Sequence, residues 1–257
     1  MIIMILCSPT PWSMIKGVLL AKIYNDLPCL KGEEEFLGLF SYTAAYEADT
    51  FTLPELVKTA SHKNIQASWL LGAPGKTLTS YIRANLRYCS PDQAAIIFAA
   101  IEQALHLGYS YSFNGLDDIS QIFLRRYRAV YHEVHRMTGF IRFHPTPEGG
   151  LAAKPQLFHR TADLILRQFA PRYPDTSLAL VLADHALVLS NGNFTSAPPE
   201  KFLPYIENDQ FTPTWEKYYQ SQYIASRKNI SLAQRVIPKK YWDWLEEGRL
   251  LASAAKK

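Results

Sequence analysis

Several side chains of the sequence could act as general acids or bases. His132-Glu133-Val134-His135 places two histidines around a carboxylate, and His144 and Asp184 follow further along the chain. An imidazole titrates near neutral pH, and a neighbouring carboxylate favours its charged form. The candidate catalytic residues are therefore His135, Glu133, His144 and Asp184.

The same histidines invite a metal interpretation, with His144 or His159 as a third ligand. The pattern H-E-x-x-H of zinc proteases places its histidines four positions apart, whereas His132 and His135 are three positions apart. A histidine on such a helix also commonly hydrogen-bonds backbone carbonyls. We expect neither a metal site nor a bound cofactor.

Two loops are similar to motifs that handle nucleotides or bases. Residues 71–77 (LGAPGKT) end like a P-loop, but Leu70 stands where the pattern requires glycine and no strand precedes it. The run HPTP at 144–147 resembles the H-P-S-P loop of uracil-DNA glycosylases, whose histidine stabilises charge on the uracil carbonyl. The preferred interpretations are a loop between two helices and a proline-rich hairpin turn.

Basic charge is confined to two stretches of the chain. Residues 120–172 hold nine Lys or Arg against three Asp or Glu, and residues 201–257 hold ten against six. The first stretch is nearly all arginine, whose guanidinium matches phosphate geometry, and the second mixes cations with aromatic rings that could stack on exposed bases. A solvated helix face and a packed aromatic core are the alternatives. The candidate nucleic-acid-binding residues are Arg136, Arg142, Arg160, Arg227, Lys228, Lys239, Lys240, Tyr241 and Trp242.

Hydropathy patterning predicts an α+β fold, with helices packed around a small, mainly antiparallel sheet. Helices are expected near 12–24, 53–60, 78–88, 91–107, 117–137, 161–169, 213–225 and 239–251, and strands near 1–6, 37–43, 177–183 and 186–189. Ser90 is expected to cap its helix, and residues 108–115 to form a turn-rich break. Gly139 is expected to end the long helix and begin a hairpin, with Met137, Ile141 and Phe143 in the core and Arg142 on the functional side.

The length of 257 residues predicts one large domain or two small ones. We divide the chain into an N-terminal region at 1–89, a C-terminal α+β domain at 90–250, expected to form one compact unit with the first, and a tail at 251–257. The apolar run at the N-terminus is shorter than the roughly 20 residues of a membrane span, and no basic region typical of a signal peptide precedes it. We therefore expect a cytoplasmic protein with no membrane partner.

Three segments together resemble one known family. They are Glu133 with His135-Arg136-Met137-Thr138-Gly139-Phe140-Ile141-Arg142-Phe143 (E-x-H-R-M-x-G-F-x-R-F), Trp215 with Tyr218-Tyr219 (W-x-x-Y-Y), and Pro238-Lys239-Lys240-Tyr241-Trp242 (P-K-[KR]-Y-W). The family is a bacterial domain of unknown function labelled probable DNA metabolism or DNA repair protein. Its genes neighbour a radical-SAM protein similar to spore photoproduct lyase, and the domain also occurs fused to uracil-DNA glycosylases. One departure is at residues 7–12 (CSPTPW), where many members carry Tyr-Asp-Gly-[ST]-Phe-Glu-Gly.

The resemblance implies a pathway and leaves the reaction open. It implies an accessory protein of DNA metabolism or repair that binds DNA and works with a radical-SAM partner. The alternative is an enzyme that acts on a modified or damaged base by glycosylase-like hydrolysis. A pocket that joins His135, Glu133 and an arginine would favour the enzyme, and a basic face would favour the binding protein.

Overall fold

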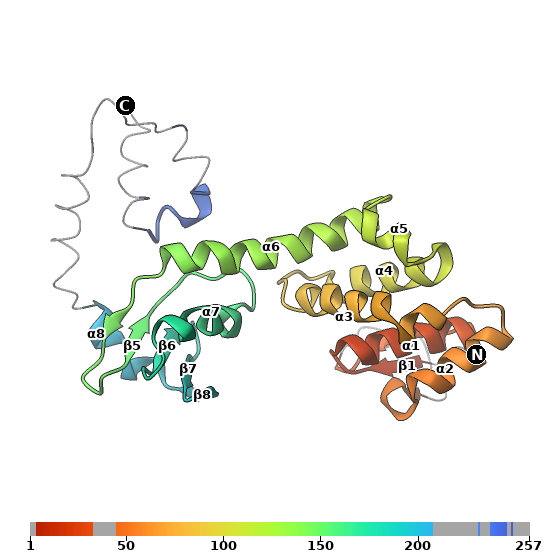
Figure 1. The fold of residues 1–257 in the computed structure, drawn as a ribbon, viewed down its shortest axis with the longest axis horizontal. Helices are drawn as coiled ribbons and strands as arrows, with labels where there is room; N and C mark the ends of the chain where they lie inside the picture. Colours follow the sequence, from red (N-terminus) through yellow and green to blue (C-terminus); the bar gives the residue numbers. More distant parts are fainter. Residues whose placement is uncertain (1–3, 33–44, 208–230, 232–236, 246–247, 249–257) are drawn as a thin grey trace. The chain divides into compact units, whose positions relative to one another are not determined.

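The computed structural model describes residues 4–32, 45–207, 231, 237–245 and 248 of the 257-residue chain (Figure 1). Its contacts divide the chain into two compact units. Unit 1 comprises Met1–His132 with Phe158–Arg160, and unit 2 comprises Glu133–Leu157 with Thr161–Lys257. The division between the units falls inside the helix Asp118–Phe140. The domain boundary expected near residue 90 stays a prediction. The expected strand at 37–43 and the helices at 213–225 and 239–251 fall wholly or largely outside the described residues.

Unit 1 is built on a three-stranded parallel sheet in the order β2-β1-β3. Strand β1 (Met4–Cys7) pairs with β2 (Leu27–Leu30) on one side and with β3 (Ala45–Glu47) on the other. Helix α1 (Pro11–Tyr24) connects β1 to β2, as parallel strands require a crossover. Thr10 accepts a hydrogen bond from the backbone N–H of Ser13, and Pro11 occupies the first turn, so the sequence fixes the start of α1.

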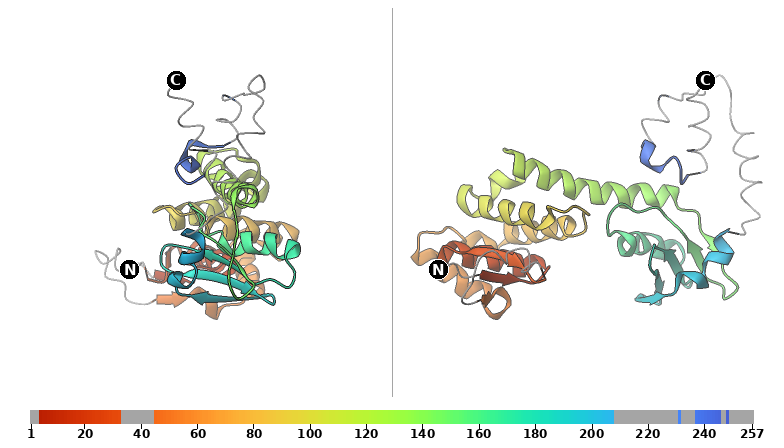
Figure 2. Two further views of the ribbon diagram at one scale, coloured as in Figure 1. Left: turned by 90° about the vertical axis from the view of Figure 1, so that its left-hand side faces the viewer. Right: turned by 180° about the vertical axis from the view of Figure 1, so that it is seen from behind.

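The remaining elements of unit 1 are helical. They are the 3₁₀ turn η2 (Ala48–Thr50), α2 (Leu53–His62), the 3₁₀ turn η3 (Ser68–Leu71), α3 (Ala73–Asn85), α4 (Gln93–Leu107), α5 (Tyr109–Asn114) and the first part of α6 (Asp118–Phe140). Helix α1 is apolar on all sides because the sheet, α2, α3 and α4 contact it. Figure 2 shows α1 beside β1 from behind.

Unit 2 holds a five-stranded sheet in the order β4-β5-β6-β7-β8. Its strands are β4 (His144–Pro145), β5 (Leu151–Ala153), β6 (Leu178–Val181), β7 (Ala186–Ser190) and β8 (Asn193–Ala197). All neighbours are antiparallel except β5 and β6, which are parallel because α7 (Ala162–Phe169) and the 3₁₀ turn η4 (Ala170–Arg172) lie between them in the chain. The 3₁₀ turn η5 (Pro199–Lys201), α8 (Leu203–Glu207) and the 3₁₀ turn η7 (Lys239–Tyr241) complete the described part.

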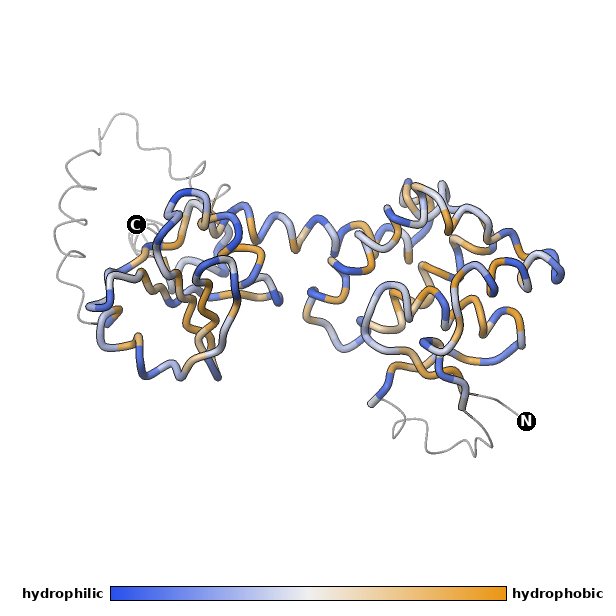
Figure 3. The backbone as a smooth tube through the Cα atoms, turned by 60° about the horizontal axis from the view of Figure 1, so that its bottom comes forward, coloured by the Kyte–Doolittle hydropathy of each residue, from blue (hydrophilic) through white to orange (hydrophobic). Residues whose placement is uncertain are grey.

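Each unit buries its own apolar residues. Figure 3 shows hydrophobic stretches gathered in the strands of unit 2 and in the helices of unit 1, while α6 alternates along its length. Two cysteines, Cys7 and Cys29, are buried in unit 1, and Cys89 is exposed. Among the described helices, none is long and apolar enough to span a membrane.

The structure confirms the α+β class and corrects several local predictions. The described residues form two sheets in place of one, and the sheet in unit 1 is parallel. Residues 108–115 contain helix α5 where a turn-rich break was expected. Gly108 (φ 89°) and Gly115 (φ 66°) flank the helix and mark its two ends. Helix α4 begins at Gln93, with Asp92 and not Ser90 at the N-cap position.

The predicted helix end at Gly139 was wrong, whereas the predicted hairpin is present as the antiparallel pair β4–β5. Helix α6 continues through Gly139 to Phe140, and the strand that follows is only His144–Pro145. Met137 and Ile141 are buried as expected, whereas Phe143 is half-buried. Arg142 does not belong to a strand: its guanidinium donates to the carbonyl of Gly139 at 3.2 Å and so satisfies an acceptor at the end of α6.

Candidate nucleic-acid interface

A buried polar network joins three segments of unit 2. The carboxylate of Glu133, on α6, is 2% exposed and accepts a hydrogen bond of 2.7 Å from the hydroxyl of Thr161. Tyr241, on η7, is fully buried and interacts with Glu133 and Arg136. A buried carboxylate is stable only with such partners, so this network fixes the 238–242 segment beside α6.

Tyr241 is neutral in this setting. Burial, and then the negative charge of Glu133, raise the pKa of the Tyr241 hydroxyl to about 12, while Arg136 opposes the shift. The ring of Tyr241 contacts that of Phe140 edge-on, with centroids 5.8 Å apart. Tyr241 is therefore a packing and anchoring residue in place of the exposed stacking platform considered from the sequence.

Two cations gather above this buried base. Arg136 is half-buried and Lys240 is exposed. Lys240 interacts with Glu133 and Arg136, and Arg136 also interacts with Tyr241. Partial burial lowers the pKa of Lys240, the nearby Arg136 lowers it further, and Glu133 works in the opposite direction. The α6 and 238–242 segments thus bring like charges together at one surface of unit 2.

The neighbouring Lys239 and Trp242 have different roles. Trp242 is buried, and its indole N–H donates to the carbonyl of Ile237 at 2.9 Å. Lys239 is exposed, with its ammonium group 6.0 Å from the centre of the Trp242 ring. Trp242 is therefore part of the buried support of the 238–242 segment, and Lys239 adds an exposed cation to the same segment. Arg227 and Lys228 lie outside the described residues.

The candidate acid–base residues are not gathered into one site by the described contacts. His135 is exposed while Glu133 is buried, although they are only two positions apart on α6. Asp184 lies in the turn between β6 and β7, where its carboxylate pairs with His185 at 2.7 Å. This bond holds the pKa of Asp184 below its usual range. His144 is half-buried in β4, at the edge of the sheet.

The loops that resembled base-handling motifs have structural roles in the described contacts. Thr146 is buried in the β4–β5 turn, where its backbone N–H donates to the carbonyl of Gly150 at 2.8 Å and its hydroxyl accepts from the N–H of Gly150 at 3.1 Å. The P-loop-like residues were expected to form a loop between two helices, but Ala73–Thr77 form the first turns of α3, and only Gly72 lies between the 3₁₀ turn η3 and this helix. Gly75 has a packing role because a Cβ there would overlap the backbone of Leu70.

A second polar cluster, in unit 1, was not recognised from the sequence. Arg126 is buried and donates to both carboxylate oxygens of Asp92 at 2.7 Å, with its guanidinium 5.0 Å from the Tyr88 ring centre. Tyr88 stacks on His159 with ring centroids 4.4 Å apart. Arg160 is exposed; its backbone N–H donates to the carbonyl of Arg87 at 2.9 Å, and its carbonyl accepts a bond of 2.9 Å from the guanidinium of Arg87. The cluster holds residues 158–160 against unit 1. Asp92 and Arg126 are 34 positions apart, and an ion pair over such a distance produces no periodic pattern in the sequence.

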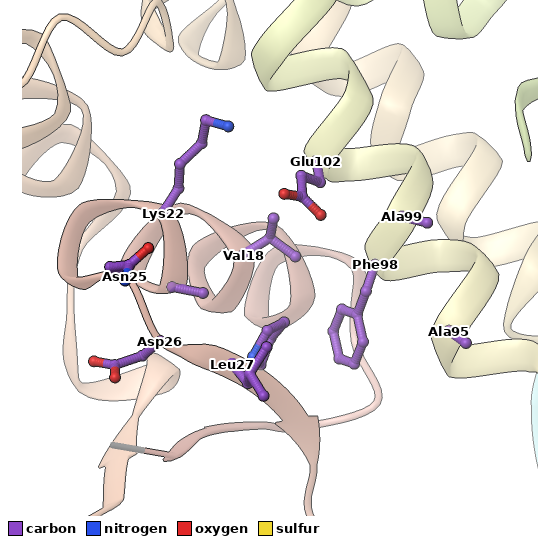
Figure 4. Close-up of a pocket in the computed structure, with 11 residues that line it drawn as sticks. Val18, Lys22, Asn25, Asp26, Leu27, Ala95, Phe98, Ala99 and Glu102 are labelled. Carbon is purple, nitrogen blue, oxygen red and sulfur yellow. The ribbon is translucent and has the colours of Figure 1, made fainter. Parts of the chain in front are cut away.

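The described cavities lie away from all these candidates. One of about 720 Å³ opens between the end of α1, β2 and α4 in unit 1. Figure 4 shows Phe98 and Leu27 on its apolar side, with the charged ends of Lys22 and Glu102 at its rim. A second cavity of about 830 Å³ also lies in unit 1, beside Trp69 and Tyr109. Neither is lined by a candidate site residue. Within the described part of the chain, no three His, Cys, Asp or Glu side chains gather in a way that could hold a metal ion.

Comparison with known proteins identifies one family. The model of a domain of unknown function, DUF4130, matches residues 91–247. The match includes the E-x-H-R-M-x-G-F-x-R-F and P-K-[KR]-Y-W segments and begins next to the boundary expected near residue 90. No curated protein and no solved structure gives a significant match.

Proposed function

The chain belongs to the DUF4130 family, a domain of unknown function, and we propose that it is an accessory protein of DNA metabolism or repair that binds nucleic acid. The resemblance of its signature segments to proteins with that label supports the pathway and a radical-SAM enzyme as partner. The observation that carries the proposal is the proximity of Arg136 and Lys240 in unit 2, with the exposed Lys239 next to Lys240 in the chain.

Like charges at one surface repel, so their grouping is most stable with a bound anion. Phosphate is the anion that an arginine and neighbouring lysines bind best, because the guanidinium donates two parallel hydrogen bonds and each ammonium adds a point charge. The partial burial of Lys240 strengthens such a contact. Glu133 offsets only part of the charge, and it is already bonded to Thr161.

The second candidate function is an enzyme that acts on a modified or damaged base. Glycosylase-like hydrolysis needs an acid or base held beside an open binding site. The described contacts commit Glu133 to Thr161 and Asp184 to His185, and His135 is exposed. We therefore rank nucleic-acid binding ahead of catalysis by these residues.

The proposal is tested by fluorescence anisotropy with labelled oligonucleotides over a series of salt concentrations. Each phosphate contact releases condensed counterions, so the logarithm of the binding constant should fall linearly with the logarithm of the salt concentration. The double variant Lys239→Ala/Lys240→Ala should bind more weakly and reduce the slope by about 0.9 per lost duplex contact.

The matched control is Lys201→Ala. Lys201 is also an exposed lysine of unit 2, but it pairs with Glu148 at 3.6 Å, and its removal should leave binding unchanged. The proposal is wrong if the native chain does not bind single- or double-stranded oligonucleotides at low salt, or if the double variant and the control behave alike.

A further inference from the structure

Three tyrosines of unit 1 form a continuous series of ring contacts that leads from the core to the surface. Tyr81 on α3 meets Tyr127 on α6 edge-on, with centroids 4.5 Å apart, and Tyr127 meets Tyr131 at 4.9 Å. At its inner end Tyr81 contacts Phe113 and the fully buried Phe123. At its outer end Tyr131 is 43% exposed. We call Tyr81, Tyr127 and Tyr131 the tyrosine ladder.

The ladder is held rigidly at all but its outer ring. Tyr81 and Tyr127 are half-buried; Tyr81 packs against Phe113 and Phe123, and Tyr127 packs against Tyr81. Burial, and then the neighbouring tyrosine hydroxyls, raise the pKa of Tyr127, so the ladder carries no negative charge near neutral pH. A neutral, pre-ordered aromatic surface binds a flat ligand at little cost in side-chain entropy.

The exposed face of α6 beside the ladder is basic. Arg128 lies one turn before Tyr131, and Arg125 lies one turn before Arg128, so the three side chains are neighbours on the helix surface. Both arginines are exposed, and neither makes a hydrogen bond or ion pair with any of the described residues. Between residues 118 and 132 of α6, the sequence contains one acidic residue, Asp118 in the first turn.

We propose that the tyrosine ladder and Arg128 form a binding surface for single-stranded nucleic acid, on which a base stacks against Tyr131 and the adjoining phosphate contacts Arg128. Aromatic rings beside cations are the arrangement that binds exposed bases without reading their sequence. A duplex keeps its base faces stacked internally and cannot use Tyr131 in this way. This inference rests on the proposed function and adds to it a strand preference and a second contact site.

The test compares single strands, matched duplexes and an abasic strand that has the same phosphates and lacks bases. Tyr131→Ala should weaken binding to the single strand about tenfold, the effect typical of losing one stacked base, and leave the abasic strand and the duplex unaffected. Tyr131→Phe should bind within about twofold of the native chain, because the stacking face remains. Arg128→Ala should reduce the salt slope on single strands by about 0.7.

Tyr205→Ala is the matched control, since Tyr205 is 40% exposed and lies in unit 2. Unchanged urea midpoints establish that the variants fold. If the native chain binds and Lys239→Ala/Lys240→Ala weakens binding while Tyr131→Ala does not, the ladder inference is wrong and the proposed function stands. If Tyr131→Ala weakens single-strand and abasic binding equally, stacking is likewise excluded. Absence of any binding by the native chain rejects both.

Discussion

Arg126 and Asp92 illustrate how unequal burial shapes an ion pair. The side chain of Arg126 is 9% exposed and that of Asp92 is 51% exposed, yet one guanidinium nitrogen lies 2.7 Å from both carboxylate oxygens. A hydrogen bond from the Ser90 hydroxyl and then the bonds from Arg126 lower the pKa of Asp92. The carboxylate of Asp92 therefore compensates the charge of the Arg126 guanidinium, which is largely shielded from water.

The first stability prediction concerns this pair. Asp92→Asn should lower the free energy of unfolding at pH 7 by about 1–2 kcal/mol, a value reduced for the exposure of Asp92. Because the folded-state pKa of Asp92 is below its ordinary value of 3.8, the stabilisation is present above that value and is lost as pH falls through the folded pKa. Urea denaturation at several pH values measures both effects.

Glu47→Gln is the control for this prediction. Glu47 pairs with Lys31 at 3.1 Å, but both side chains are well exposed, and such a pair contributes about 0–1 kcal/mol. Equal losses in the two variants at pH 7, or a loss in Asp92→Asn that does not diminish toward low pH, would contradict the prediction.

At the scale of elements, Thr161 connects α6 to α7. Thr161 occupies the N-cap position of α7, but its hydroxyl makes no capping bond and donates instead to the carboxylate of Glu133. The bond joins two elements that are 28 positions apart in sequence. Loss of this donor leaves the buried Glu133 short of one partner.

We expect Thr161→Val, which keeps the side-chain shape, to lower the free energy of unfolding by about 1–3 kcal/mol. The same change should weaken nucleic-acid binding only modestly, because the cations themselves remain. Thr195→Val on β8 is the control, since Thr195 is exposed in a strand and valine is tolerated there. A smaller loss for Thr161→Val than for Thr195→Val, read from denaturation midpoints, would show that the Glu133 contact is unimportant.

Local patterns predicted the elements whose ends carry a chemical signal. The helices expected near 12–24 and 117–137 are present as α1 (Pro11–Tyr24) and α6 (Asp118–Phe140), and Thr10 and Pro11 mark the start of α1. Strands β2 and β8 were missed. Strand β2 contains Pro28 and β8 is polar, and each lies at a sheet edge where neither composition is excluded.

The candidate site was predictable only in part. The sequence suggested Arg136, Lys239 and Lys240 as cations, and their proximity depends on contacts between α6 and 238–242 that no local pattern encodes. Tyr241 and Trp242 were candidate binding residues with packing beneath a basic surface as the alternative, and their burial bears out the alternative. The tyrosine ladder was not recognised from the sequence, because the pattern of a single helix does not show which rings of two different helices meet.

At the scale of the whole molecule, each unit carries its own basic surface. Lys240 belongs to unit 2 and Arg128 to unit 1, and α6 contributes residues to both units. If both proposals hold, the two cations neutralise different phosphates of one strand. Their contributions to binding should then be independent.

The corresponding prediction is an additive double-mutant cycle. Lys240→Ala and Arg128→Ala, measured singly and together on a long single strand, should give binding free energies that add within about 0.5 kcal/mol and salt slopes that add. Anisotropy at several salt concentrations supplies both quantities. A coupling above about 1 kcal/mol would mean that the two residues act on the same phosphate, contrary to the prediction.

The distribution of the three cysteines has a practical consequence for spectroscopy. Cys7 lies in the innermost strand of unit 1, where burial raises its pKa to about 12, and Cys29 is buried in the adjacent strand. Because the thiolate is the form that attacks maleimides and iodoacetamides, Cys7 is unreactive in the folded chain. Cys89 alone is exposed, at the cluster that holds residues 158–160 to unit 1. The native sequence therefore accepts one fluorophore or spin label at a defined position, with no cysteine replaced.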